Sequence, residues 1–121
     1  MGHLYYGNSA EPFEIPDRVL AHLKVVVSTK LRRAESFTLS WRHGADTAPG
    51  RTTLWLQPSI PLRFQFAGAE PEALNPAHLK DLVTQANSSS GLTVDLDAQI
   101  PDAVAPARRP LAPVGRAGVA A

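Results

Sequence analysis

The chain has 121 residues, a formal net charge of +1 and no cysteine. Its length suits one domain with one hydrophobic core, and the lack of cysteine excludes disulfides, thiolate nucleophiles and Cys-ligated zinc. Residues 1–96 carry nine Lys/Arg against nine Asp/Glu, so they lack the basic excess that a surface neutralising nucleic-acid phosphates usually brings.

The N-terminal residues predict a short β-hairpin. Apolar runs at residues 4–7 and 12–15 flank a segment in which Gly7 and Asn8 suit the positive φ of a turn. No basic region followed by an apolar run precedes them, and no stretch approaches the roughly 20 apolar residues of a membrane span. We therefore expect a soluble cytoplasmic protein that makes no use of a membrane.

A helix is predicted to begin at Pro16 or Asp17, because proline is favoured in the first turn and an acidic residue there complements the helix dipole. Helical spacing predicts a buried apolar stripe on one side of it. The opposite side should be an exposed cationic face. The stripe consists of Leu20, Leu23, Val27 and Leu31, and the cationic face carries Arg18, His22, Thr29, Arg32 and Arg33, with Lys24 and Lys30 on its flanks.

Three strands should follow, at residues 36–43, 52–57 and 58–66, because apolar and polar side chains alternate in each of them. A Pro-Gly pair between the first two predicts an antiparallel hairpin over residues 36–57. Pro61 predicts that the third strand lies at an edge or begins after it. One outward sheet face would then present Thr38, Ser40, Arg42, Thr53, Trp55, Gln57, Arg63 and Gln65.

A second helix should be capped by Asn75 and opened by Pro76, with Leu79, Leu82, Val83 and Ala86 at helical spacing. A short strand at residues 92–96 completes the order β-β-α-β-β-β-α-β. This order predicts a single α+β domain over residues 1–96, mainly an antiparallel sheet with two helices on one face. Residues 97–121 are rich in Ala and Pro, and we expect them to form a disordered tail whose cations are Arg108, Arg109 and Arg116.

Two surfaces are candidates for binding. On the sheet face, Trp55 with Arg42 and Arg63 could stack a base, hold a carboxylate or form cation–π pairs; the alternative is that Trp55 is covered by the second helix or by an arginine stem. On the helix, the cationic face could dock on phosphates or on an acidic partner; the alternative is an ordinary solvated face. The candidate residues are Arg42, Trp55, Arg63, Arg18, His22, Arg32 and Arg33.

Catalytic and metal-binding patterns are not evident. Ser40, His43 and Asp46 are close in sequence, but a strand end and a loop give no reason for triad geometry. The four histidines lack the HxH or HExxH spacing of zinc sites, and neither GxGxxG nor GxxxxGK[ST] occurs. We expect no metal and no cofactor.

The runs YYGNSAEPFEIPDRVLAHLKVVVSTKLRRAESFTLSWRH and TLWLQPSIPLRFQF resemble a family of small actinobacterial domains of unknown function. The resemblance covers nearly all of residues 1–96. Members often carry an automated label, ATP-dependent DNA ligase, which implies a DNA-associated context. The ligase nucleophile motif Lys-x-Asp-Gly is missing at all three lysines, Lys24, Lys30 and Lys80.

These observations favour a non-enzymatic binding or accessory module. Its partner would be an unidentified protein or, as the alternative, nucleic acid in the DNA-associated context that the ligase label implies. The oligomeric state is left open by the sequence.

Overall fold

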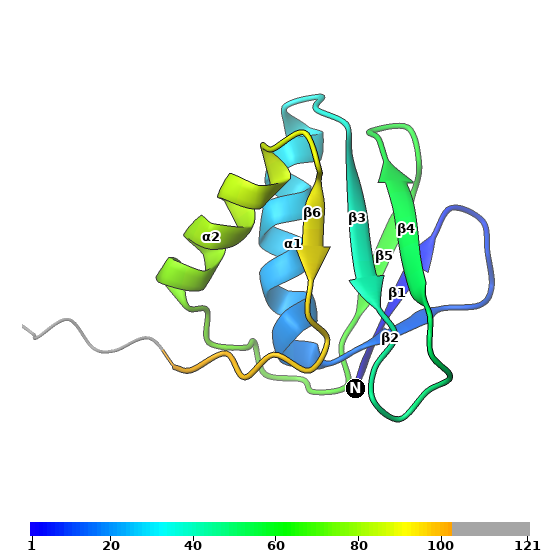
Figure 1. Cartoon of the computed structure of the whole chain (residues 1–121), viewed down its shortest axis with the longest axis vertical. Helices are drawn as coiled ribbons and strands as arrows, with labels where there is room; N and C mark the ends of the chain where they lie inside the picture. Colours follow the sequence, from blue (N-terminus) through cyan, green and yellow to red (C-terminus); the bar gives the residue numbers. More distant parts are fainter. Residues whose placement is uncertain (103–121) are drawn as a thin grey trace, which may run out of the picture.

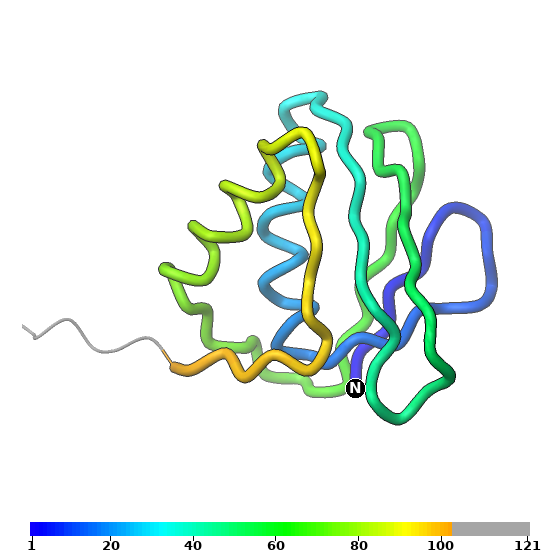
Figure 2. The backbone as a smooth tube through the Cα atoms, in the orientation of Figure 1, coloured from blue at the N-terminus to red at the C-terminus, as the bar shows by residue number. Residues whose placement is uncertain are grey.

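The computed structural model describes residues 1–102, and within them the order of strands and helices is β-β-α-β-β-β-α-β, as the sequence predicts. The α+β class is confirmed (Figures 1 and 2). The elements are β1 (Gly2–Tyr6), β2 (Phe13–Ile15), α1 (Asp17–Arg32), β3 (Phe37–Arg42), β4 (Arg51–Leu56), β5 (Leu62–Gln65), α2 (Pro76–Ala86) and β6 (Leu92–Val94).

The six strands of residues 1–102 divide between two sheets instead of forming one. The order is β2-β1-β5 in the first and β4-β3-β6 in the second. All pairings are antiparallel except that of β3 with β6, which is parallel. The predicted hairpin of residues 36–57 is confirmed as β3 and β4, and β5 begins directly after Pro61 at a sheet edge, where the missing proline N–H removes no ladder bond.

Both sheets and both helices contribute to one hydrophobic cluster. Phe13 and Trp41 meet edge to face with ring centroids 5.2 Å apart, which joins the two sheets. The Tyr6 hydroxyl donates a hydrogen bond to the carbonyl of Trp55 and joins them a second time. The fully buried side chains of the cluster include Leu4, Ile15, Leu20, Leu23, Leu39, Leu56 and Leu92.

More side chains of α1 are buried than the predicted apolar stripe contains. Leu20, Leu23 and Val27 are buried as expected, whereas Leu31 is only half-buried. The reason for the wider burial is that α2 packs against α1 and β6, on the side of α1 away from β4 (Figure 1). This second contact buries side chains of α1 that a single sheet would leave in solvent.

Helix α2 begins where Asn75 accepts a hydrogen bond from the N–H of His78, which confirms the predicted cap. Leu82 and Ala86 are buried, but Val83, predicted to belong to the same apolar stripe, is 40% exposed. After α2, Gly91 turns the chain into β6 with φ +80, and a Cβ there would lie 2.0 Å from Oγ1 of Thr38. Only glycine fits this position.

Packing against the domain continues past residue 96, the predicted domain boundary. Residues 97–102, expected to belong to the tail, lie against the domain, and Ile100 is 9% exposed within the hydrophobic cluster. Their carbonyl groups accept hydrogen bonds from α1, which the Ala/Pro-rich composition does not reveal. The remainder of the predicted tail, with Arg108, Arg109 and Arg116, lies outside the described residues.

Candidate functional site

The outward side of the β4-β3-β6 sheet is a polar surface, which we call the outer sheet face. Strand register sets its side chains in rows: Thr38 opposite Trp55, Ser40 opposite Thr53, and Arg42 opposite Arg51. Ser40 and Thr53 share a hydrogen bond of 2.8 Å between their hydroxyls. The outer sheet face comprises Thr38, Ser40, Arg42, Arg51, Thr53, Trp55 and Thr93.

Two arginines are directly opposite each other at one end of this face. Arg42 and Arg51 are exposed, and neither takes part in an ion pair within residues 1–102. Like charges at a directly paired position destabilise a sheet. A hollow of about 590 Å³ lies beside them, lined in part by Ser40, Thr53 and Thr93. Two guanidinium groups beside hydroxyls form a site suited to a carboxylate or another oxyanion.

Trp55 lies on the same face and is 55% exposed. This exposure does not agree with the alternative prediction, that α2 or an arginine stem covers Trp55; Ala86, the last residue of α2, only lines a hollow beside it. The hollow at its side, of about 360 Å³, is lined by Thr38 and by residues 86–89 and 91. The indole is therefore available for contact with a partner.

Arg63 does not belong to this surface. Strand β5 pairs with β1 in the other sheet, and the Arg63 guanidinium lies 3.9 Å from the centroid of the Tyr5 ring. Grouping Arg63 with Arg42 and Trp55 assumed a single sheet. Arg51, by contrast, was missed, because the predicted strand began at residue 52; extending the alternation by one residue would have placed it opposite Arg42.

The cationic helix face is largely a structural contact surface. Arg18, predicted to be free, donates hydrogen bonds of 2.9 Å to the carbonyls of Ala73, Ile100 and Pro101. It also forms an ion pair of 3.1 Å with Asp102. One side chain thus holds the loop before α2 and residues 100–102 against α1, and it is not available to a phosphate.

His22 is 0% exposed, contrary to the prediction of a solvent-facing residue. Its Nδ1 lies 2.7 Å from the carbonyl oxygen of Arg18, and its Nε2 lies 2.9 Å from the backbone nitrogen of Asn75. A carbonyl only accepts and an N–H only donates, so Nδ1 carries the hydrogen and Nε2 is the acceptor. His22 is a neutral histidine that fixes the start of α2.

At the other end of α1, Lys30 is also buried. Its ammonium group donates to Oδ1 of Asn87 at 2.8 Å and pairs with Glu35 at 3.1 Å. Arg33 lies 3.7 Å from Glu35, and Arg32 has no ion pair in residues 1–102. Of the cations on the predicted face and its flanks, Lys24, Arg32 and Arg33 are exposed.

His78 makes folding stability sensitive to pH. Burial lowers the pKa of His78 from its ordinary value of 6.5, while the carboxylate of Asp81 opposes this shift. The unfolded chain therefore binds a proton more readily than the folded one. We expect the free energy of unfolding to be highest above pH 6.5 and to fall as the pH drops through the lowered pKa of the folded state.

Urea unfolding between pH 5 and 8 measures this effect. The variant His78→Gln should show a flatter pH dependence than the wild type, and His43→Gln is the control. If the free energy of unfolding depends on pH equally in His78→Gln and the wild type, the pH dependence does not come from His78.

The three residues considered for catalysis are not joined. Ser40 hydrogen-bonds Thr53, while His43 bonds Thr52 and the carbonyl of Ala48. None of these bonds includes Asp46. Within the described part of the chain no group of three or more His, Cys, Asp or Glu residues could hold a metal ion. Neither helix in residues 1–102 has the length and apolarity needed to cross a membrane.

Comparison with known families gives one match. Residues 1–97 match the family described as Domain of unknown function (DUF7882). The chain belongs to this family. No curated protein and no solved structure matches the chain. Membership confirms the resemblance to a family of domains of unknown function, and the family's description assigns no activity and no partner. The function is therefore argued from the surfaces of the domain.

Proposed function

We propose that this domain is a non-enzymatic binding module whose outer sheet face holds an extended acidic segment of a partner protein. The observation that carries the proposal is the Arg42–Arg51 pair. Two unpaired guanidinium groups at one paired position cost stability in the free domain, and a carboxylate bound between them would offset their repulsion while accepting bidentate hydrogen bonds.

Trp55 supplies the second contact. It lies four residues from Arg51 along β4, which at about 3.3 Å per residue is a separation of roughly 13 Å. An extended peptide covers this distance in about four residues. The face therefore favours a segment with an aromatic or aliphatic residue about four positions from a pair of acidic residues.

Charge favours an acidic protein over nucleic acid. Residues 1–102 carry nine Lys/Arg and eleven Asp/Glu, so the described part of the chain has a slight negative charge. Nucleic-acid affinity comes largely from many phosphate contacts, whereas one acidic cluster needs only a local cationic pair. The cytoplasmic location remains a prediction from the sequence, and the DNA-associated context remains what the family label implies.

Binding is tested by the fluorescence anisotropy of labelled peptides that carry a Tyr and a Glu-Glu pair at spacings of two, four and six residues. The four-residue spacing should bind best. Arg42→Ser with Arg51→Ser should weaken binding at least about tenfold, and Trp55→Ser should do so to a similar degree, because each removes one of two contacts. Lys80→Ser, an exposed charge on α2, is the matched control.

Two outcomes would contradict the proposal. If the affinity depends neither on the spacing between the Tyr and the Glu-Glu pair nor on Arg42, Arg51 and Trp55, the outer sheet face is not the binding site. Tighter binding of a ten-nucleotide dT strand that falls steeply with salt and with Arg32→Glu and Arg33→Glu would favour the nucleic-acid alternative.

A further inference from the structure

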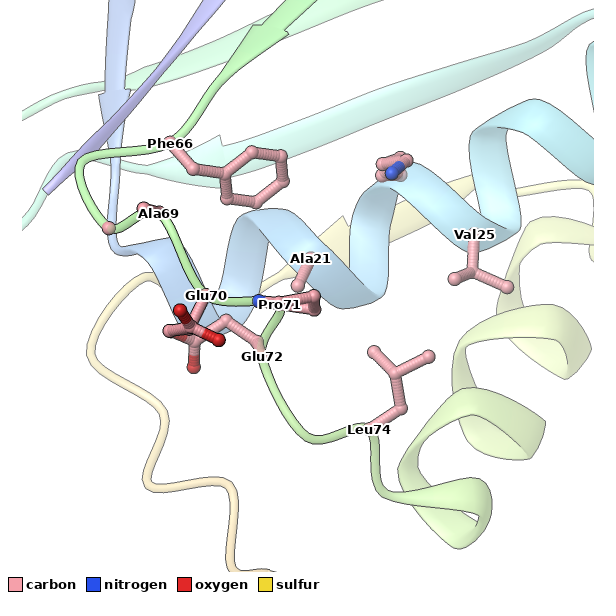
Figure 3. Close-up of a pocket in the computed structure, with 10 residues that line it drawn as sticks. Ala21, Val25, Phe66, Ala69, Glu70, Pro71, Glu72 and Leu74 are labelled. Atoms are coloured by element: carbon pink, nitrogen blue, oxygen red, sulfur yellow. The ribbon is translucent and has the colours of Figure 1, made fainter.

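A second candidate binding surface lies beside α1. A groove of about 270 Å³ separates α1 from the loop that leads to α2. Figure 3 shows the side chains of Val25 and Leu74 pointing toward one another across it, with Phe66 above Ala21 and the carboxylates of Glu70 and Glu72 grouped together away from Val25. We call it the α1–loop groove; it is lined by Ala21, Lys24, Val25, Phe66, residues 68–72 and Leu74.

The groove has an apolar floor that the described part of the chain leaves uncovered. Val25 is 36% exposed and Leu74 is 38% exposed. Neither Glu70 nor Glu72 forms an ion pair in residues 1–102. Exposed aliphatic side chains beside unpaired carboxylates suit an occupant that combines apolar residues with cations.

The loop that forms one wall is fixed at both ends. The Asp17 carboxylate accepts hydrogen bonds from the N–H groups of Ala67 and Gly68, at 3.0 to 3.1 Å. At the other end, Arg18 binds the carbonyl of Ala73. The groove is therefore formed in advance, which lowers the ordering cost of filling it.

The described chain ends beside this groove. The same Arg18 guanidinium that binds Ala73 also binds the carbonyl of Pro101 and pairs with Asp102. The last described residue, Asp102, therefore lies next to the loop wall. The sequence of residues 103–121, AVAPARRPLAPVGRAGVAA, holds three arginines, no acidic residue, and several aliphatic residues and prolines.

We propose that residues 108–114 of this same chain, RRPLAPV, dock in the α1–loop groove. Arg108 and Arg109 pair with Glu70 and Glu72, and Leu111 covers Val25 and Leu74. The arginines complement the acidic rim, and a proline-rich segment suits an apolar groove because its extended backbone loses little entropy on binding.

The short segment that joins Asp102 to Arg108 acts as a tether and makes this docking favourable. Arg108 is six residues beyond Asp102, a span of at most about 20 Å in extended chain. A short tether gives the segment an effective concentration in the millimolar range. Weak individual contacts are then sufficient for occupancy. The docked segment leaves the outer sheet face free, so this inference is independent of the proposed function.

Because the chain has no cysteine, a pair of introduced cysteines can report the docking through the rate at which they form a disulfide. The full chain with Ala69→Cys and Ala112→Cys should form an internal disulfide, with oxidised glutathione as the oxidant, at least tenfold faster than the full chain with Lys80→Cys and Ala112→Cys. Adding Glu70→Lys and Glu72→Lys should slow the first pair about fivefold. Arg108→Glu and Arg109→Glu in that background should restore the rate.

Equal rates for the two cysteine pairs, or a rate that is unaffected by the charge reversals, would overturn the proposal. Disulfides that form between chains and depend on protein concentration would show a second copy as the occupant and would overturn it too. Far-UV circular dichroism of each variant confirms that the domain is folded.

Discussion

Leu23→Asp is expected to abolish cooperative folding. Leu23 is 0% exposed, in the hydrophobic cluster shared by both sheets and both helices. A carboxylate there would be buried with no partner, and a substitution of this kind costs at least about 4 kcal/mol. Small domains have a free energy of unfolding of about 5–15 kcal/mol, so this loss removes much or all of it. Urea unfolding followed by circular dichroism measures the effect.

The matched control is Ser28→Asp, five residues along the same helix and outside the α1–loop groove. Ser28 is exposed, so its aspartate remains hydrated, and the free energy of unfolding should change by less than about 1 kcal/mol. A Leu23→Asp protein with the wild-type urea midpoint would contradict the position assigned to α1.

His22→Leu is the second substitution with a large expected effect. It keeps a side chain of similar bulk but removes the Nε2 acceptor, leaving the N–H of Asn75 unpaired in a buried position. An unsatisfied buried donor costs about 1–3 kcal/mol. Asn75 also caps α2, so its displacement would weaken the start of that helix.

His22→Gln is the informative comparison, because its side-chain oxygen can accept the hydrogen bond that Nε2 accepts in the wild type. It should retain at least half of the stability that His22→Leu loses, as measured by urea unfolding at pH 8. Equal destabilisation by Leu and Gln would mean that packing of the ring, rather than its hydrogen bond, is what matters.

The local elements were predictable from the sequence because each has a local cause. Alternation predicted β3 and β4, and Asn75 followed by Pro76 predicted the start of α2. The periodicity of Leu20, Leu23 and Val27 predicted the buried side of α1. These signals depend on neighbours within a few residues, where physical preferences are strong.

The contacts between distant segments were not predictable in the same way. His22 is polar and lies off the apolar stripe, and its burial depends on Asn75, 53 residues later in the chain. Arg63 was placed in the wrong sheet because nothing local indicates that β5 pairs with β1 rather than β4. Arg18 resembles any surface arginine in sequence, and its partners follow at residues 73, 100, 101 and 102.

The candidate site shows the same difference between local signals, which the sequence reveals, and contacts between distant segments, which it does not. Trp55 and Arg42 were predicted to share an outward sheet face because alternation along paired strands is a local property. Arg51 completes the cationic pair only through the register of the hairpin. Two of the predicted helix residues, Arg18 and His22, instead hold the fold together.

Mapping of backbone amide chemical shifts, with the peptide of four-residue spacing added to the full chain, tests the proposed binding surface most directly. The account predicts the largest changes at Arg42, Arg51, Thr53 and Trp55, with little change at Arg32, Arg33 or the α1–loop groove. No change at the outer sheet face, or larger changes at the end of α1, would contradict it.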